Sequence, residues 1–287
     1  MERRKVTVAI PFFNAERYLG DAVKSVLNQT FVDWELLLID DGSTDGSTEI
    51  ARSFCSDSRI RVISDGKNRG LVARLNESVA LANGEFYARM DADDIMHPRR
   101  LERQLEFLVK HKEIDVIGSG YYSIDAENNI MYLRRVEPEL NRLYPRFLHP
   151  SAMARTEWFR QNPYRAAWER MEDFELWMRT GATSRIYSLQ VPLMFYREFG
   201  MPSYAKYDKS MKGLARLFKR RREYAIPPLY SLKMRAVTLV KIILARTVNL
   251  FCNGNLDLLV KLRKVENIPF DKVKAEHALR EAIKNLN

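Results

Sequence analysis

The sequence has few cysteines and no long uncharged apolar segment, and both absences exclude classes of protein. Its 287 residues contain 2 cysteines, Cys55 and Cys252, which lie far apart in the chain. This number and spacing suit neither a disulfide framework nor a zinc site, and they favour a reducing compartment. No uncharged apolar run reaches the roughly 18 residues of a membrane-spanning helix. No apolar core follows the basic start at residues 1–5, so we expect no secretion signal.

Common phosphate-binding motifs are also missing. No G-x-G-x-x-G follows the first strand-like segment, residues 6–10, which argues against a Rossmann dinucleotide site. Residues 66–70 are bounded by glycines but lack the Gly-Lys-Ser/Thr ending of a P-loop. The glycine- and arginine-rich first loop of a nucleotidyltransferase is absent after Ile10. These three classes of nucleotide-binding protein are therefore disfavoured.

Positive charge is concentrated in one part of the chain, whose formal net charge is +10. Residues 1–204 contain 28 Lys and Arg against 30 Asp and Glu, whereas residues 205–264 contain 15 against 3. A nearly neutral body thus carries a basic C-terminal segment, which indicates an anionic partner such as a membrane or a nucleic acid. No recognised nucleic-acid-binding module accompanies the charge, so we expect no nucleic-acid partner.

The basic segment has the pattern of cationic, apolar helices. Basic residues at 212, 216 and 219–222 alternate with leucine and phenylalanine, and apolar residues at 237–251 surround Lys241 and Arg246. Helices of this kind can lie in a membrane interface. We therefore expect residues 205–287 to form a basic helical region, of which residues 205–264 hold the protein at an anionic membrane surface. The alternative is a helical subdomain packed on the rest of the chain, or on a second subunit of a homo-oligomer.

Strand-like and helix-like segments alternate in the first half of the chain. The β-α-β-α order predicts an α/β fold with a mostly parallel sheet flanked by helices. We expect Asn14 to cap the first helix and Pro98 to occupy the first turn of the fourth. The expected strands are residues 6–10, 35–39, 61–63, 86–90 and 114–117, and the expected helices include residues 18–27, 71–84 and 98–111.

Polar clusters follow three of these strands, at residues 11–14, 40–45 and 91–94. Ligands of parallel sheets bind beyond the carboxyl ends of the strands, so we expect the clusters to converge on one site. Asp91, Asp93 and Asp94 place three carboxylates within four residues, and like charges this close repel one another. A divalent cation relieves that repulsion, and hard oxygen ligands suit Mg²⁺ or Mn²⁺. The alternative is a solvated acidic turn.

Six short motifs, taken together and in this order, resemble the family 2 glycosyltransferases of the GT-A fold. They lie at residues 8–14, 25–31, 38–45, 68–71, 92–94 with Pro98 and Arg99, and 172–177. The resemblance implies a catalytic domain over residues 1–204, with a nucleotide-sugar-binding half at about 1–95 and an acceptor half at about 96–204. It also implies a nucleotide-diphosphate-sugar donor and inversion at the anomeric carbon.

The resemblance assigns a donor site to residues on the first, second and fourth strand ends. Asp41 would accept the N3–H of uracil, which favours a UDP-sugar, and Asp91 would meet the ribose. Asp93 would coordinate the metal between the phosphates, with Asp94 supporting it. An Asp40–Asp41 turn that caps the next helix, and an exposed Arg69 without a ligand, are the alternatives. The full donor set is Pro11, Phe13, Asn14, Asp40, Asp41, Arg69, Asp91 and Ala92.

The catalytic base implied by the resemblance is Asp173. An inverting transfer needs a carboxylate that takes the proton of the acceptor hydroxyl, and the apolar residues after Asp173 would raise its pKa by burial. Glu172 and Glu175 are rivals for this role. His149, Glu172 and Trp177 are expected on the acceptor side, although His149 could equally pack in a strand. A histidine metal ligand is not expected, because Glu198 stands near the position where many relatives have one.

The sequence therefore predicts an enzyme that adds single sugars. The Gln-x-x-Arg-Trp motif and the transmembrane helices of processive synthases are both absent. We expect transfer to a glycan or a lipid-linked acceptor in surface polysaccharide synthesis, by a cytoplasmic protein that is peripheral at the inner face of the membrane. The alternative is a nucleotide-sugar-binding or scaffold protein of the same fold, without catalysis.

Overall fold

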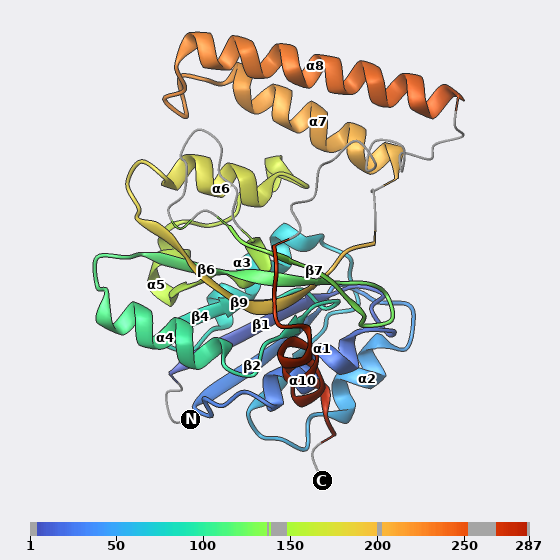
Figure 1. The fold of residues 1–287 in the computed structure, drawn as a ribbon, viewed down its shortest axis with the longest axis vertical. Helices are drawn as coiled ribbons and strands as arrows, with labels where there is room; N and C mark the ends of the chain where they lie inside the picture. Colours follow the sequence, from blue (N-terminus) through green and yellow to red (C-terminus); the bar gives the residue numbers. More distant parts are fainter. Residues whose placement is uncertain (1–4, 137, 139–147, 200–202, 252–267, 286–287) are drawn as a thin grey trace.

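The computed structural model describes residues 5–136, 138, 148–199, 203–251 and 268–285. They build one sheet with helices on both faces (Figure 1), in the strand order β3-β2-β1-β4-β8-β6-β9-β5, with β7 paired to β6. The strands are β1 Val6–Phe12, β2 Trp34–Asp40, β3 Ile60–Ile63, β4 Phe86–Arg89, β5 Ile95–Met96, β6 Val116–Ile124, β7 Ile130–Arg134, β8 Met153–Arg155 and β9 Ile186–Arg197.

The helices cover both faces of the sheet and extend beyond it at one end. They are α1 Leu19–Leu27, α2 Ser47–Ser53, α3 Leu71–Leu81, α4 Arg100–Lys110, α5 Thr156–Gln161, α6 Glu172–Thr180, α7 Tyr204–Lys219, α8 Pro228–Phe251 and α10 Lys272–Ile283. Single 3₁₀ turns lie at His149–Ser151 and Ala166–Trp168. The predicted α/β class is confirmed.

The first half of the sheet is parallel throughout. β1 pairs in parallel with β2 and with β4, and β2 pairs in parallel with β3. All seven residues of β1 and of β2 are buried, as expected for near-continuous apolar strands covered on both faces. The carboxyl ends of β1, β2 and β4 therefore open on one edge of the sheet. From β4 onward the pairing is mixed, because β8 runs antiparallel to both β4 and β6.

Alternate side chains of each strand enter two separate cores. In β2, Leu36 and Leu38 face the core covered by α1 and α4, while Leu37 and Ile39 face the core covered by α3, α5 and α6. Each fully buried leucine or isoleucine contributes about 1.5–3 kcal/mol of transfer free energy, so both layers stabilise the central strands. The second core lies directly beneath α6, the helix that carries Asp173.

Two expected helix starts are wrong. α1 begins at Leu19, and Asn14 does not cap it. Asn14 instead has a positive φ of 49°, and its Oδ1 accepts a hydrogen bond from the main-chain N–H of Thr44 at 2.8 Å. It ties the loop after β1 to the loop after β2. α4 begins at Arg100, two residues after Pro98, whose carbonyl accepts from Thr30 N at 2.9 Å.

The C-terminal region divides into two parts by its packing. α7 lies against α6 in a small core that includes Trp168, Met171 and Phe218, and α8 lies on α7. α10 returns to the sheet, where Leu279 packs with Ile95. The expected boundary at residue 204 stays a prediction, but α10 belongs by its contacts to the body of the sheet. Across the described ranges, none of the helices has both the length and the hydropathy that crossing a bilayer requires.

Candidate active site

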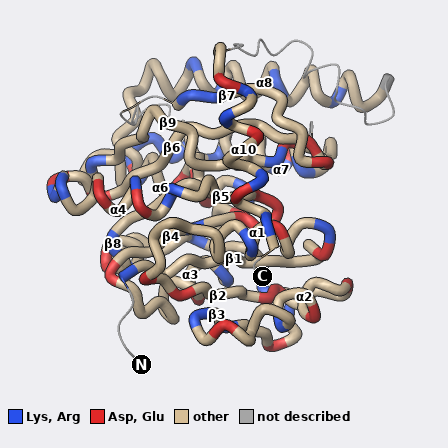
Figure 2. Tube along the Cα trace, turned by 60° about the horizontal axis from the view of Figure 1, so that its bottom comes forward, with Lys and Arg blue, Asp and Glu red and all other residues tan. Residues whose placement is uncertain are grey.

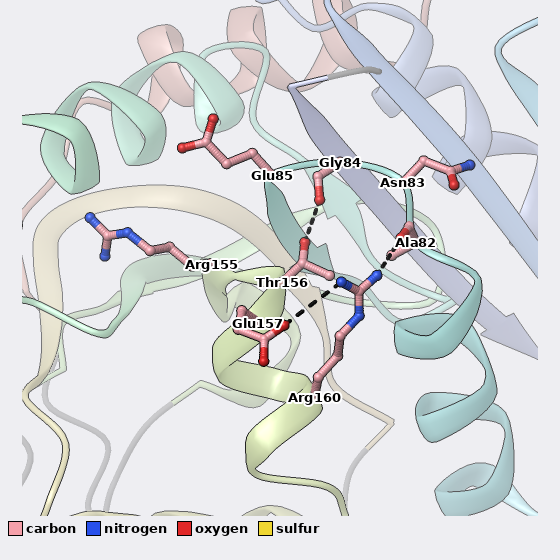
Figure 3. A pocket seen from close by; sticks show the side chains of 8 residues that line it. All are labelled: Ala82, Asn83, Gly84, Glu85, Arg155, Thr156, Glu157 and Arg160. Atoms are coloured by element: carbon pink, nitrogen blue, oxygen red, sulfur yellow. Dashed lines mark hydrogen bonds and ion pairs between the residues drawn. The ribbon is translucent and has the colours of Figure 1, made fainter. Parts of the chain in front are cut away.

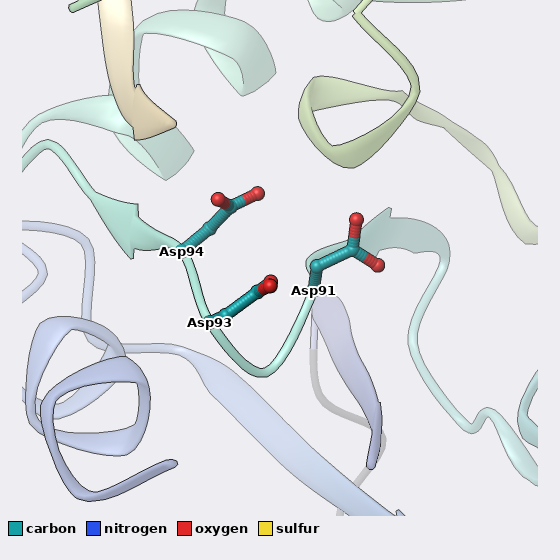
Figure 4. A group of neighbouring side chains, drawn as sticks. All are labelled: Asp91, Asp93 and Asp94. Carbon is teal, nitrogen blue, oxygen red and sulfur yellow. The ribbon is translucent and has the colours of Figure 1, made fainter. Parts of the chain in front are cut away.

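The acidic loop, residues 91–94, connects β4 to β5 at the carboxyl edge of the parallel strands. Asp91, Asp93 and Asp94 each present an oxygen within 4.8 Å of the other two (Figure 4). Ala92 is buried at the tip of this loop. The three carboxylates predicted to share a site therefore do share one.

The end of β9 fixes the loop in place. The main-chain N–H of Arg197 donates to Asp94 Oδ1 at 3.0 Å, and the Arg197 guanidinium donates to the carbonyl of Asp93 at 2.8 Å. Asp94 is 1% exposed, and its Oδ2 has no hydrogen-bond partner among the described residues. A buried carboxylate oxygen without a donor is costly, and a cation bound at the loop would offset that cost.

Burial and repulsion keep the carboxyls of Asp93 and Asp94 from ionising easily. Burial, together with the charge of Asp91, raises the pKa of Asp93 to about 6. Burial, with Asp93 and Asp91 close by, raises the pKa of Asp94 well above its usual range. Oxygen ligands that repel one another and include an unpartnered atom fit Mg²⁺ or Mn²⁺ by the chemistry of the donor set.

Arg89 is a residue of the site that sequence reasoning missed. It ends β4, is 2% exposed, and donates from Nη2 to Asp91 Oδ1 at 2.5 Å. Its Nε and Nη1 have no hydrogen-bond partner within the described part of the chain. An arginine in the otherwise apolar run of residues 86–90 was the available signal. Two buried N–H groups without acceptors indicate that a ligand or water completes this site.

The N-terminus of α6 brings two more carboxylates to Arg89. Glu172 and Asp173 occupy the first turn of α6, where the helix dipole favours negative charge. Burial raises the pKa of both, and the positive charge of Arg89 opposes that shift in each case. Asp173 Oδ1 accepts from the N–H of Phe174 at 2.6 Å, whereas Glu172 Oε2 has no partner among the described residues. The acidic loop and the first turn of α6 thus both lie close to the buried guanidinium of Arg89.

The residues expected on the acceptor side, His149, Glu172 and Trp177, are all buried. His149 is buried, its Nε2 lies 2.8 Å from the hydroxyl of Tyr164, and burial beside Arg89 holds the pKa of its imidazole well below the usual range. Trp177 is 1% exposed and packs edge-on against His149 at 5.8 Å between ring centroids. Glu172 is buried as well, so an acceptor contact by any of these three stays a prediction.

The loops after β1 and β2 interlock at the same edge of the sheet. Pro11 is buried in β1, and Phe13, the first residue after that strand, is 48% exposed. Asp40 is buried and accepts from the N–H of Ser43 at 2.9 Å and the hydroxyl of Ser64 at 2.7 Å. These bonds, with burial opposing them, lower the pKa of Asp40, so it is a fixed anion.

Asp41 holds the loop at residues 68–70 against the end of β2. Its Oδ1 accepts from Arg69 N at 2.7 Å and from Arg74 Nε at 2.9 Å, and its Oδ2 accepts from Gly70 N at 3.0 Å. Gly42 makes the approach feasible, because its φ is +74° and an added Cβ would lie 2.8 Å from the main-chain carbon of Lys67.

Neither Asp40 nor Asp41 caps α2, whose N-cap residue is Gly46. The helix-capping alternative for this turn is therefore wrong. The Arg69 side chain is half-exposed and pairs with Asp65, so it is not a cation without a partner. Asp41 Oδ2 accepts a single bond among the described residues and retains acceptor capacity toward a ligand. Donor contacts by Asp40, Asp41 and Arg69 stay predictions.

A pocket of about 380 Å³ lies at the opposite end of β4 (Figure 3). It is lined by residues 82–85, 155–157 and 160. Two of these side chains donate hydrogen bonds to main-chain carbonyls of the same lining. Thr156 donates to the carbonyl of Gly84 at 2.6 Å, and Arg160 donates to that of Ala82 at 2.9 Å. Since Gly84 precedes β4 and Asp91 follows it, this pocket is separate from the acidic loop.

The family model for "Glycosyl transferase family 2" matches residues 7–174. This match covers more than half of the chain and includes the acidic loop and Asp173. The chain therefore belongs to the family 2 glycosyltransferases, and the resemblance in its motifs is confirmed.

Two relatives show the range of similarity. EpsE of Bacillus subtilis, which carries a glycosyltransferase name, is 37% identical over 203 residues, covering 68% of this chain and 73% of EpsE. WfgD of Escherichia coli, named as a UDP-Glc:alpha-D-GlcNAc-diphosphoundecaprenol beta-1,3-glucosyltransferase, is 34% identical over 131 residues, covering 46% of this chain and 51% of WfgD.

Solved structures share the fold at low sequence identity. Residues 1–349 of TarS from S. aureus, in complex with UDP-GlcNAc, give a TM-score of 0.65 at 16% identity, covering 98% of this chain and 82% of that one. The mannosyltransferase PcManGT from Pyrobaculum calidifontis, in complex with GDP-Man and Mn²⁺, gives a TM-score of 0.60 at 15% identity, covering 99% and 86%. This chain therefore has the architecture of GT-A-type glycosyltransferases.

Proposed function

We propose that the protein is an inverting, metal-dependent glycosyltransferase that moves one sugar from a UDP-sugar to a hydroxyl of a glycan or lipid-linked acceptor. The observation that carries the proposal is the meeting of the acidic loop, the buried Arg89 and the carboxylates of α6 at one end of the parallel sheet. Groups that suit a diphosphate, next to a candidate base, support this reaction.

Asp173 acts as the base in this proposal. Its carboxylate takes the proton of the acceptor hydroxyl while that oxygen bonds to the anomeric carbon and the bond from this carbon to the diphosphate oxygen breaks. A raised pKa improves a carboxylate as a base. Glu175 is not placed for the role, because it is fully buried and its Oε1 accepts from Arg179 at 3.0 Å. Glu172 remains the rival.

Asp93 and Asp94, with Asp91, would hold the divalent cation, and a cation bound there offsets charge on the leaving diphosphate. The chain prepares this site with its own residues. Arg197 fixes the loop from β9, and Arg89 pairs with Asp91 and so reduces the repulsion among the neighbouring carboxylates. The Mn²⁺ in the PcManGT complex supports a divalent metal in this protein.

The donor and acceptor classes are supported by the relatives. The names of WfgD and of the TarS complex specify uridine nucleotides, although PcManGT holds GDP-Man. Asp41, with free acceptor capacity beside the loop at 68–70, suits the N3–H of uracil. The WfgD name specifies a diphosphoundecaprenol acceptor, which supports a lipid-linked acceptor in polysaccharide synthesis at the inner face of a membrane.

A donor screen tests the proposal. The full chain is incubated with Mn²⁺ and a panel of UDP-, GDP- and dTDP-sugars, and released nucleoside diphosphate is measured for the unmodified protein and for Asp173→Asn. We expect a UDP-sugar to be turned over by the unmodified protein and not by the variant. Tight binding of a nucleotide sugar without any turnover would favour the non-catalytic alternative. Turnover that is equal without a divalent cation would refute the metal dependence.

A further inference from the structure

α8 buries its small side chains and exposes its large apolar ones. The buried residues among its 24 are Ser231, Thr238 and Ala245. They recur every seven residues, about two helical turns, and form one seam along the helix. Ser231 Oγ donates to the carbonyl of Phe218 at 2.5 Å, and Thr238 Oγ1 donates to that of Met234 at 2.7 Å. The seam faces α7, the helix against which α8 packs.

The apolar face of α8 lies opposite this seam. At about 100° per residue, its members fall within roughly 80° on either side of the direction that points away from the seam. Exposed apolar surface in this amount on one helix marks an interaction surface. The members and their exposures are Leu229 80%, Leu232 62%, Leu239 57%, Val240 55%, Ile243 53%, Leu244 51% and Leu250 76%.

Basic side chains border the apolar face on both sides. By the same helical geometry Arg235 and Arg246 lie along one edge and Lys241 along the other, while Lys233 lies within the face. All four are exposed, and none of them forms an ion pair with the residues that the structure describes. α8 contains no aspartate or glutamate. The chemistry of the face is therefore apolar at its centre and cationic at its rim.

Among the described residues, this face of α8 is exposed on the side away from α7. α8 is the outermost layer in Figure 1, and α7 lies between it and α6. Figure 2 shows the Lys and Arg positions as blue bands along α7 and α8. We propose that α8 lies in the interface of an anionic membrane, with its apolar face among the acyl chains and Arg235, Lys241 and Arg246 at the lipid phosphates.

Charge decides between a membrane and a second copy of the chain. Two copies joined through this face would bring together rims that are cationic on both sides, with no acidic residue on α8 to offset them. Like charges so placed destabilise an interface. Anionic lipid supplies the missing negative charge and also accepts the apolar centre, so the membrane satisfies both halves of the pattern.

Membrane contact through α8 would also orient α6, the helix that carries Asp173, relative to the membrane. α7 approaches the start of α6 so closely that a Cβ on Gly213 would lie 2.7 Å from Cγ of Met171, the N-cap residue of α6. The layer formed by α7 and α8 is therefore packed directly onto the turn that carries Asp173. Binding through α8 does not depend on sugar transfer, and it is measured without donor or acceptor.

Flotation with liposomes tests the surface. The full chain is mixed at low salt with vesicles of phosphatidylcholine alone, or of equal parts phosphatidylcholine and phosphatidylglycerol. We expect flotation only with the anionic vesicles. The triple variant Arg235→Gln, Lys241→Gln, Arg246→Gln should bind about 100-fold more weakly, since each cation near an anionic surface contributes about fivefold. The matched control, Arg52→Gln, Lys110→Gln, Lys112→Gln, removes equal charge from exposed positions elsewhere and should bind normally.

The apolar face has its own variant and control. Leu232→Gln, Leu239→Gln, Ile243→Gln should abolish the binding that survives high salt, whereas Val32→Gln, Val191→Gln, Val273→Gln removes three exposed apolar side chains elsewhere and should not. Protein that stays at the bottom of the low-salt gradient overturns the proposal, as does equal loss in variant and control. A dimer in sedimentation that the α8 variant abolishes would show that a second copy covers the face. Sugar transfer to a soluble acceptor should be unchanged in every variant, which separates this proposal from the enzymatic one.

Discussion

The active-site region and α8 depart from the usual distribution of side chains in opposite directions. Around the acidic loop, charged groups are buried, including Asp94 at 1% and Arg89 at 2% exposure. On α8, leucines are exposed while a serine and a threonine are buried. Buried charges and exposed apolar stripes are both uncommon in a chain that acts alone. In each region this departure supports the partner that we propose: a cation and a diphosphate at the loop, and an anionic apolar layer at α8.

The largest expected effect comes from removing the candidate base. Asp173→Asn keeps the size of the side chain and eliminates its ability to take a proton, so transfer should fall by ~10²–10⁴-fold. UDP-sugar affinity, measured by calorimetry, should change little, because the donor contacts that we propose lie on the loops after β1, β2 and β4. Glu172→Gln is the comparison. If that variant loses transfer and Asp173→Asn does not, Glu172 is the base.

The next effect compares the stability contributions of two arginines on neighbouring strands. Arg89→Gln should lower the free energy of unfolding by about 3 kcal/mol, since removing one partner of a buried ion pair leaves the other charge uncompensated. Arg155→Gln is the control, because Arg155 lies on the neighbouring β8 and donates only to main-chain carbonyls in the described structure, at 3.3 Å. Its loss should cost about 1 kcal/mol. Equal urea midpoints for the two variants would contradict a special role for Arg89.

Local patterns in the sequence predicted the parallel half of the sheet and the parts of the site that local patterns encode. The apolar run at residues 36–39 predicted a strand buried on both faces, and β2 covers it. The carboxylates at 91–94 are neighbours in the chain, so their meeting needed no tertiary information. The family motifs placed Glu172 and Asp173 correctly at the start of a helix.

What the sequence could not predict depends on contacts between distant segments. The role of Arg89 in the site depends on the charges of Glu172 and Asp173, and the packing of α6 brings these two residues close to it. Asn14 follows the usual pattern of a helix cap, but its partner is the loop after β2. For α8 the sequence pattern left open whether the apolar stripe meets a membrane or packs on the rest of the chain. The buried seam at Ser231, Thr238 and Ala245 shows which side of the helix packs on α7. α10 packs on α1 and β5 without a sequence motif that indicates it.

A third prediction tests the acidic loop as the metal-dependent half of the donor site. Asp93→Ala should abolish the increase in UDP affinity that Mn²⁺ gives, because it removes a ligand that the flanking carboxylates cannot replace. Glu106→Ala, which removes an exposed acid from α4, is the control and should leave that increase intact. If calorimetry on the unmodified protein gives the same UDP affinity with and without Mn²⁺, the assignment of the loop fails.

The smallest expected effect is a pH dependence of the metal site. Burial beside Asp91 raises the pKa of Asp93 to about 6 from its usual 3.8, so between these values the folded, metal-free protein holds a proton that the unfolded chain releases. For this group alone, stability in the absence of metal therefore falls as the pH rises through that window. Metal binding has the opposite dependence, because a carboxylate must lose its proton to become a ligand.

The increase in melting temperature caused by Mn²⁺ should accordingly be larger about one unit above pH 6 than about one unit below it, with affinity falling up to tenfold per unit on the acid side. The Asp93→Ala variant should show almost no Mn²⁺-induced shift at either pH, which distinguishes the titration of this carboxyl from general effects of acid. A shift that is the same at both pH values in the unmodified protein would mean that Asp93 is already ionised when the metal arrives. Its repulsion from Asp91 would then be weaker than the buried geometry of the loop indicates.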